Sequence, residues 1–206
     1  ARHEPTGMPV ALKLTPTANT DPAGVELETA TLARLHHPSI VRVHNQGSLD
    51  VSMLDHPAGT RWLAMELATS ASLGRISTLG WGDVADLVQQ VLGALAHAHA
   101  RGVLHRDVKP GNVLYFDDAV VPWKLADFGI AHHLGQPTAH LGGSPSYVAP
   151  EQSGHREDQG PWTDLYALGH TAWHLVTGQR RPWERDDDHS FRHLSVPFAP
   201  RFDVPE

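Results

Sequence analysis

The sequence predicts an α+β protein with a small, β-rich N-terminal part and a mainly helical C-terminal part. Segments 9–14 and 61–68 are typical of strands, the first because its hydrophobic and polar residues alternate. Residues 83–100 repeat hydrophobic side chains at helical spacing, as an amphipathic helix does. The change from one pattern to the other places the boundary between the two parts near residue 68.

The N-terminal part is expected to contain strands and one helix. In the strand 9–14, Ala11 and Lys13 share one face, because side chains alternate along a strand. Asp21 and Pro22 predict the start of a helix that ends at His37-Pro38, since Asp suits the N-cap and Pro the first helical turn. Two further strands are predicted, at 39–44 and 61–68.

The C-terminal part is expected to begin with the helix 83–100, which Gly102 ends. A loop as long as 127–161, rich in Gly, Pro, Ser and His, is usually functional in a compact domain. The remaining elements are predicted in this order: short strands near 113–116 and 122–126, a helix capped by Thr163 and ended by Gly178, and an irregular tail at 179–206.

Composition excludes several classes of protein. The chain has 206 residues, of which 40% are hydrophobic and 19% charged, a mix typical of globular domains. It has no cysteine, so disulfide scaffolds and thiolate metal sites are excluded. No apolar run is long enough to span a bilayer, and no secretory leader is evident. The net charge of −7 disfavours nucleic acid as a partner. Because the first residue is Ala, we expect a piece of a longer chain.

Lysine is rare in a chain that otherwise uses arginine. Only Lys13, Lys109 and Lys124 occur, against 13 arginines. An ammonium and a planar guanidinium are not interchangeable, so a lysine kept in such a chain is expected to be chemically required. The 16 histidines are scattered, and a zinc or nickel site is the weaker interpretation of them.

Four short motifs occur in a fixed order. They are Val-Ala-Leu-Lys at 10–13, His-Arg-Asp-Val-Lys-Pro-Gly-Asn at 105–112, Asp-Phe-Gly at 127–129 and Ala-Pro-Glu at 149–151. In this order and at this spacing they resemble the serine/threonine protein kinases of the bacterial, eukaryotic-like (Hanks) type. The segments 94–112 and 143–152 are especially similar to that group.

The resemblance implies a protein-kinase-like two-lobed fold that is incomplete at both ends. Residues 1–68 would form a partial N-lobe without its Gly-rich loop, since only twelve residues precede Lys13. Residues 69–206 would form a partial C-lobe without the last helices of the family.

The resemblance also assigns the catalytic residues. Lys13 would bind the α- and β-phosphates of ATP and pair with Glu28; taken alone, Glu28 would be a solvated helix carboxylate. Asp107 would accept the proton of the substrate hydroxyl, and Lys109 would neutralise charge at the γ-phosphate. Asp164, at the start of a later helix, would brace the catalytic loop or simply cap its own helix.

Mg²⁺ and adenine sites follow from the same resemblance. Asn112 and Asp127 would hold two Mg²⁺ ions through oxygen atoms, which a hard cation prefers. Ala11 would form the ceiling of the adenine pocket and Leu114 its floor. Met65 would be the gatekeeper, followed by the hinge from Glu66 to Ala68. For Met65 and Leu114 plain core packing is the alternative.

The expected function is transfer of the γ-phosphoryl group of ATP to Ser or Thr hydroxyls of protein substrates. One alternative is a truncated, non-catalytic kinase-like module that binds nucleotide or partners; another is a small-molecule kinase of the aminoglycoside or choline type, which Lys109 and the Ala-Pro-Glu motif disfavour. A cytoplasmic location is expected, with any membrane anchor outside this segment. A homodimer of kinase domains is among the partners that the resemblance allows.

Autophosphorylation of the loop between Asp127 and Glu151 is also expected. In the family, an Arg at the position of Arg106 awaits a phosphate on this loop, and a guanidinium can bind phosphate through two hydrogen bonds. Thr138 lies in mid-loop between glycines and is the predicted site, the alternative being an unmodified solvent-exposed threonine.

Overall fold

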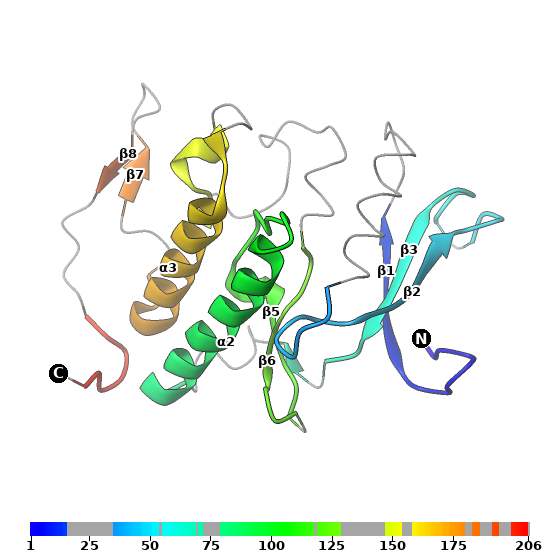
Figure 1. The fold of residues 1–206 in the computed structure, drawn as a ribbon, viewed down its shortest axis with the longest axis horizontal. Coiled ribbons are helices and arrows are strands. Elements are labelled where there is room, and N and C mark those ends of the chain that lie inside the picture. Colours follow the sequence, from blue (N-terminus) through cyan, green and yellow to red (C-terminus); the bar gives the residue numbers. More distant parts are fainter. Residues whose placement is uncertain are drawn as a thin grey trace.

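The computed structural model places a three-stranded sheet at one end of the molecule and two helices side by side at the other, with a second small sheet between them (Figure 1). This arrangement confirms the predicted α+β class and its β-rich N-terminal part. The structure describes residues 1–15, 35–53, 55–68, 70–71, 79–117, 119–128, 147–153, 158–179, 183–185, 191–193 and 199–205.

The first sheet has the order β1-β3-β2 and is antiparallel throughout. Its strands are β1 (Val10–Thr15), β2 (Val43–Ser48) and β3 (Arg61–Glu66). Ala11 pairs with Met65 and Lys13 with Leu63, so β1 holds both residues against the central strand. The strands predicted at 9–14 and 61–68 are thereby confirmed, with the second ending two residues earlier.

The strand predicted at 39–44 is only partly correct. Ile40 forms a parallel bridge to Leu125, which belongs to a second sheet. The Val41 amide donates to the Leu125 carbonyl at 2.9 Å. The Leu125 amide in turn donates to the Ser39 carbonyl at 2.8 Å. The apolar residues at 40 and 41 are buried by this contact between the sheets, and regular pairing with β3 begins only at Val43.

The second sheet is formed by strands that follow residue 68 in the sequence. It has the order β4-β5-β6, with β4 (Ser70–Ala71), β5 (Val113–Tyr115) and β6 (Trp123–Leu125). β5 and β6 confirm the two short strands of the sequence analysis. β4 was not predicted, because two residues are too few for an alternating pattern to be visible.

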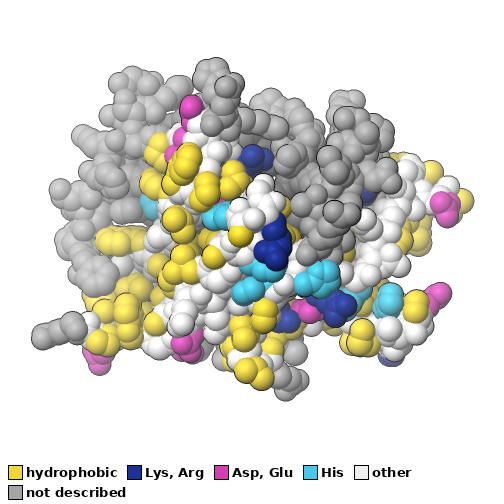
Figure 2. Space-filling view, in the orientation of Figure 1, with side chains coloured by type: hydrophobic (Ala, Val, Ile, Leu, Met, Phe, Trp, Pro, Cys, Tyr) yellow, Lys and Arg dark blue, Asp and Glu magenta, His cyan; other side chains and the backbone are white. Residues whose placement is uncertain are grey.

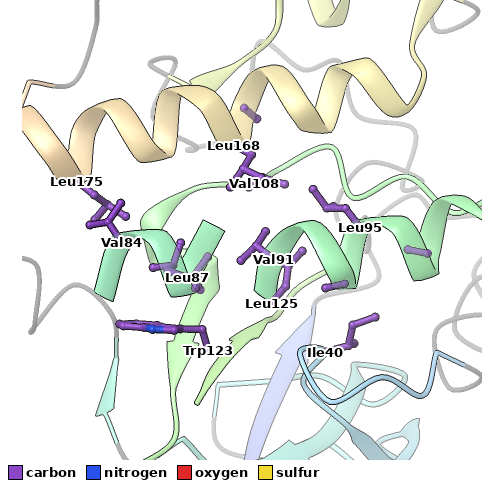
Figure 3. Packing of buried hydrophobic residues seen from close by; sticks show 14 of the residues in the cluster. Ile40, Val84, Leu87, Val91, Leu95, Val108, Trp123, Leu125, Leu168 and Leu175 are labelled. Atoms are coloured by element: carbon purple, nitrogen blue, oxygen red, sulfur yellow. The ribbon is translucent and has the colours of Figure 1, made fainter. Parts of the chain in front are cut away.

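The hydrophobic core lies between α2 (Trp81–His99), α3 (Pro161–Thr177) and β6. α2 turns one face inward because its apolar residues recur every three or four positions. Figure 3 shows this face packed between Trp123 of β6 and Leu168 of α3. The buried residues of α2 are Val84, Leu87, Val91, Ala94, Leu95 and Ala98.

α3 begins earlier than predicted. Gly160 is the N-cap and Pro161 the first helical residue, where the fixed φ of proline suits the helix and its missing N–H costs nothing. Thr163, predicted as the cap, is the third helical residue instead. Its hydroxyl accepts the Gly160 N–H at 3.1 Å and donates to Glu151 at 2.7 Å. Gly178 ends the helix with a φ of 75°, as expected for a glycine C-terminal cap.

The sequence predicted an irregular tail at 179–206, but part of this tail forms a regular element. β7 (Trp183–Arg185) and β8 (Phe191–His193) pair as an antiparallel hairpin. The prediction failed because charged residues and prolines around these short strands hide their pattern. The helix predicted to start at Asp21-Pro22 lies almost wholly outside the described residues, and so does most of the 127–161 loop.

The outer face of α3 carries hydrophobic side chains. Trp162 and Leu165 are about half exposed, at 57% and 48%, and yellow side chains gather over α3 in Figure 2.

Across the described ranges, no helix has the length and apolar character that crossing a membrane requires.

Candidate active site

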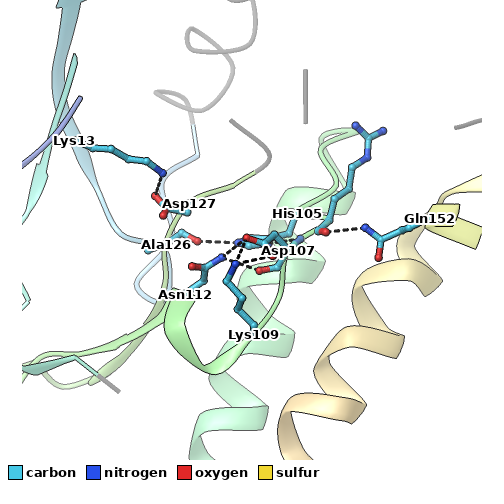
Figure 4. Close-up of polar contacts among 9 residues, drawn as sticks. Lys13, His105, Asp107, Lys109, Asn112, Ala126, Asp127 and Gln152 are labelled. Carbon is cyan, nitrogen blue, oxygen red and sulfur yellow. Dashed lines mark hydrogen bonds and ion pairs between the residues drawn. The ribbon is translucent and has the colours of Figure 1, made fainter. Parts of the chain in front are cut away.

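The loop after α2 places two of the predicted site residues around the carboxylate of a third. The Lys109 ammonium donates to both oxygens of Asp107, at 3.0 and 2.7 Å. The Asn112 amide donates to Asp107 Oδ2 at 2.9 Å and to the Asp107 carbonyl at 2.8 Å (Figure 4). The carboxylate is therefore fixed in direction, and its side chain remains 36% exposed, so a substrate can reach it.

Lys13 reaches across from the first sheet to the Asp127 carboxylate. Lys13 Nζ lies 2.7 Å from Asp127 Oδ1, and each side chain is about one-third exposed. The partner predicted for Lys13, Glu28, lies outside the described residues. The observed pair joins Lys13 of β1 to Asp127, which lies two residues after β6 (Figure 4).

His105 connects the catalytic loop to the segment that carries Asp127. Its buried ring donates from Nε2 to the Ala126 carbonyl at 2.8 Å and accepts the Asp107 N–H at Nδ1, at 3.2 Å. Burial lowers the pKa of His105, against the opposing effects of the Asp164, Asp107 and Asp127 carboxylates. A neutral ring with its proton on Nε2 satisfies both hydrogen bonds.

Asp164 holds the catalytic loop from the first turn of α3. Its carboxylate accepts the amide N–H of His105 at 2.8 Å and that of Arg106 at 2.6 Å. It also bonds His99 Nε2 at 2.7 Å, which ties α2 to the same point. Asp164 is fully buried, and these contacts show it bracing the loop.

Two non-glycine residues of the site have left-handed backbones. Arg106 has a φ of 65° and Asp127 a φ of 61°, a conformation that costs free energy unless the surroundings enforce it. The Arg106 amide donates to Asp164, and its carbonyl accepts from Gln152 Nε2 at 2.8 Å. Beside Asp127, the Ala126 N–H donates to the Asn112 carbonyl at 2.8 Å. The Arg106 backbone and the residue before Asp127 are therefore held by defined hydrogen bonds.

The donor set at Asn112 and Asp127 fits magnesium. Asn112 uses its NH₂ group on Asp107, and its carbonyl oxygen points away from that carboxylate in Figure 4. Asp127 has a second oxygen besides the one that pairs with Lys13. One amide oxygen and one carboxylate are hard ligands of the type Mg²⁺ accepts, with further positions filled by water and phosphate.

The residues predicted around adenine come from two sheets. Ala11 and Met65 are paired neighbours in the first sheet, and Leu114 lies on β5 in the second. None of the three belongs to the buried core, and each is partly exposed, unlike a core residue. Glu66 ends β3, and Ala68 lies between β3 and β4. Their role in binding adenine remains a prediction.

Sequence reasoning missed two supporting residues. Gln152 accepts the Ala149 N–H at 2.8 Å and donates to Arg106, so it joins the Ala-Pro-Glu segment to the catalytic loop. Its place directly after that motif was the only signal. No sequence signal pointed to His99, because its partner Asp164 lies 65 positions further along the chain.

Comparison with known proteins agrees with this geometry. Residues 1–199 match the protein kinase domain family. The chain belongs to that family. The serine/threonine-protein kinase PknA of Mycobacterium tuberculosis is 36% identical over 196 residues, which cover 88% of this chain and 44% of PknA. PknI of Mycobacterium bovis is 40% identical over 159 residues, covering 73% of this chain and 24% of PknI. This kinase domain therefore spans less than half the length of these relatives. The predicted resemblance to bacterial Ser/Thr kinases is confirmed.

A solved structure supports the same fold. A crystal structure of Rad53 residues 1–466 in complex with AMP-PNP superposes with a TM-score of 0.67 at 26% identity, covering 89% of this chain and 45% of Rad53. The kinase domain thus has the two-lobed kinase fold that the motifs predicted.

Proposed function

We propose that this kinase domain transfers the γ-phosphoryl group of ATP to Ser or Thr hydroxyls of protein substrates. The observation that carries the proposal is the Asp107 carboxylate, held by Lys109 and Asn112 and still open to solvent. Its relatives PknA and PknI are serine/threonine-protein kinases by name. The non-catalytic alternative is not favoured, because Lys13, Asp107 and Lys109, which the proposal places in catalysis, each contact another residue of the site.

The residues have distinct tasks in the reaction. The substrate oxygen forms a bond to the γ-phosphorus while the bond from that phosphorus to the ADP oxygen breaks, and the hydroxyl proton passes to Asp107. Lys109 lies within hydrogen-bond distance of Asp107, where its charge can stabilise the phosphoryl oxygens. Lys13 would bind the phosphates at the far side of the site.

Mg²⁺ bound by Asn112 and Asp127 would neutralise the phosphate oxygens. Lys13 and Asp127 would then contact the same phosphate chain instead of each other, since their 2.7 Å contact leaves no space for a ligand between them. We also infer a cytoplasmic location, where ATP is available.

Asp107→Asn tests the proposal. It removes the proton acceptor but no phosphate contact, so radiolabel transfer from ATP to a protein acceptor should be abolished while Mg-ATP binding, measured by calorimetry, stays near the parent value. Asp86→Asn, on the exposed face of α2, is the matched control. A variant at 107 that keeps most of its turnover would overturn the proposed mechanism.

Autophosphorylation at Thr138 is part of the same proposal and rests on the sequence, because Thr138 lies outside the described residues. The protein incubated with Mg-ATP should carry phosphate on Thr138 by mass spectrometry, and Thr138→Ala should be less active. Activity equal to the parent in that variant would count against the switch.

A further inference from the structure

The third lysine of the chain forms an ion pair that neither the motifs nor the proposed reaction uses. Lys124 Nζ lies 2.7 Å from Glu66 Oε2, and the two side chains are only 15% and 22% exposed. The same ammonium lies over the ring of Phe116, 4.5 Å from its centroid. The Lys124 ammonium is thus held between a carboxylate and an aromatic ring, and partial burial strengthens both the ion pair and the cation–π interaction.

The pair connects the two sheets at the segment predicted to bind adenine. Glu66 is the last residue of β3 in the first sheet, whereas Lys124 lies on β6 in the second. Lys124 is the direct partner of Leu114, so the two side chains share one face of the β5–β6 pair. Leu114 is the predicted floor of the adenine pocket, which places Lys124 beside that floor.

We propose that Lys124 is a positioning residue for nucleotide binding, which holds the 66–68 hinge against the second sheet. Beyond the hinge, Ala71 is already fixed to Leu114 by strand pairing. Lys124 fixes the other end, at Glu66, so the backbone that would contact the base is held on both sides. Affinity then rises because less conformational freedom is lost on binding.

This role explains why the chain keeps a lysine here. An arginine would place a wider, planar group between Glu66 and Phe116, and the chain uses arginine at nearly every other cationic position. All three lysines then lie at the nucleotide site: Lys13 and Lys109 at the phosphates and Lys124 at the base.

The inference rests on the proposed function, and the experiment separates the two. Lys124→Met leaves Glu66 partly buried without its cation, so the KM for ATP should rise about tenfold while kcat stays nearly unchanged. Calorimetry should show the same loss for Mg-ATP and none for Mg-tripolyphosphate, which has no base. The charge swap of Lys124→Glu with Glu66→Lys should recover most of the ATP affinity.

Controls keep each outcome decisive. Arg101→Met removes a cation at the end of α2 and should change neither ligand's affinity. If Lys124→Met does not fold, Glu66→Gln, which removes the negative charge of the pair, is expected to give the same split between the two ligands. Unchanged ATP affinity in a folded variant, or equal losses for ATP and tripolyphosphate, would overturn the role of Lys124. A parent protein that binds both ligands but transfers no phosphate would instead contradict the proposed function.

Discussion

A single buried carboxylate, Asp164, holds the backbone of the two residues that precede Asp107, the proposed proton acceptor. It accepts two successive amide N–H groups and contacts His99, so no oxygen is left without a partner. In Asp164→Asn the new NH₂ group would face one of those N–H donors. We expect a loss of about 2–4 kcal/mol in the free energy of unfolding, measured by urea denaturation, and a lower kcat. The same change at exposed Asp86 should alter neither; an Asp164→Asn variant as stable as the parent would contradict this account.

The short 3-10 helix at Pro150–Ser153 acts on the site through one side chain. Gln152→Glu keeps an oxygen for the Ala149 N–H but cannot donate to the Arg106 carbonyl when ionised. We expect a loss of about 1–3 kcal/mol in unfolding free energy, because the carbonyl of Arg106, a residue with a left-handed backbone, loses its donor. Denaturation at pH 7.5 measures it, with Gln89→Glu on the exposed face of α2 as control. Equal losses in the two variants would assign the effect to added charge.

Elements with long, regular patterns could be predicted, and contacts between distant elements could not. The helix at 81–99 and the strand at 10–15 are visible because many residues repeat one spacing. β4 has only two residues, too few for a period, and charged residues and prolines around β7 and β8 hide the pattern of these two strands. At the site, the motif order identified Asp107, Lys109 and Asn112, which lie within one loop. The Lys13–Asp127 and Lys124–Glu66 pairs arise only when the two sheets meet.

The whole molecule should lose stability in mild acid. Partial burial lowers the pKa of His37 and, with Arg101 nearby, that of His97, as burial does for His105. The rings of His37 and His97 lie 5.2 Å apart, and histidines lie together near the middle of the face in Figure 2. Below a pH of about 6.5 the unfolded chain binds more protons at these residues than the folded one, so folding is disfavoured as the pH falls.

We therefore expect a lower unfolding free energy at pH 5.5 than at pH 7.5, measured by urea denaturation. His97→Gln should reduce the difference between the two values, because it removes one proton-binding group and the repulsion of its neighbour. His56→Gln, away from this cluster, should leave the difference as it is. An unfolding free energy that is equal or greater at pH 5.5 would contradict the destabilising role given to these histidines.

The bridge between Ile40 and Leu125 also has a consequence for how the chain folds during synthesis. Ribosomes add about 5–20 residues per second, so Ile40 emerges several seconds before the strand that will cover it. During that interval Ile40 and Val41, both buried in the folded molecule, have no β6 to pair with. A contact so distant in sequence slows folding and prolongs the exposure of aggregation-prone surface. We therefore expect the nascent chain to depend most on a chaperone while its synthesis has passed Ile40 and has not yet reached Leu125.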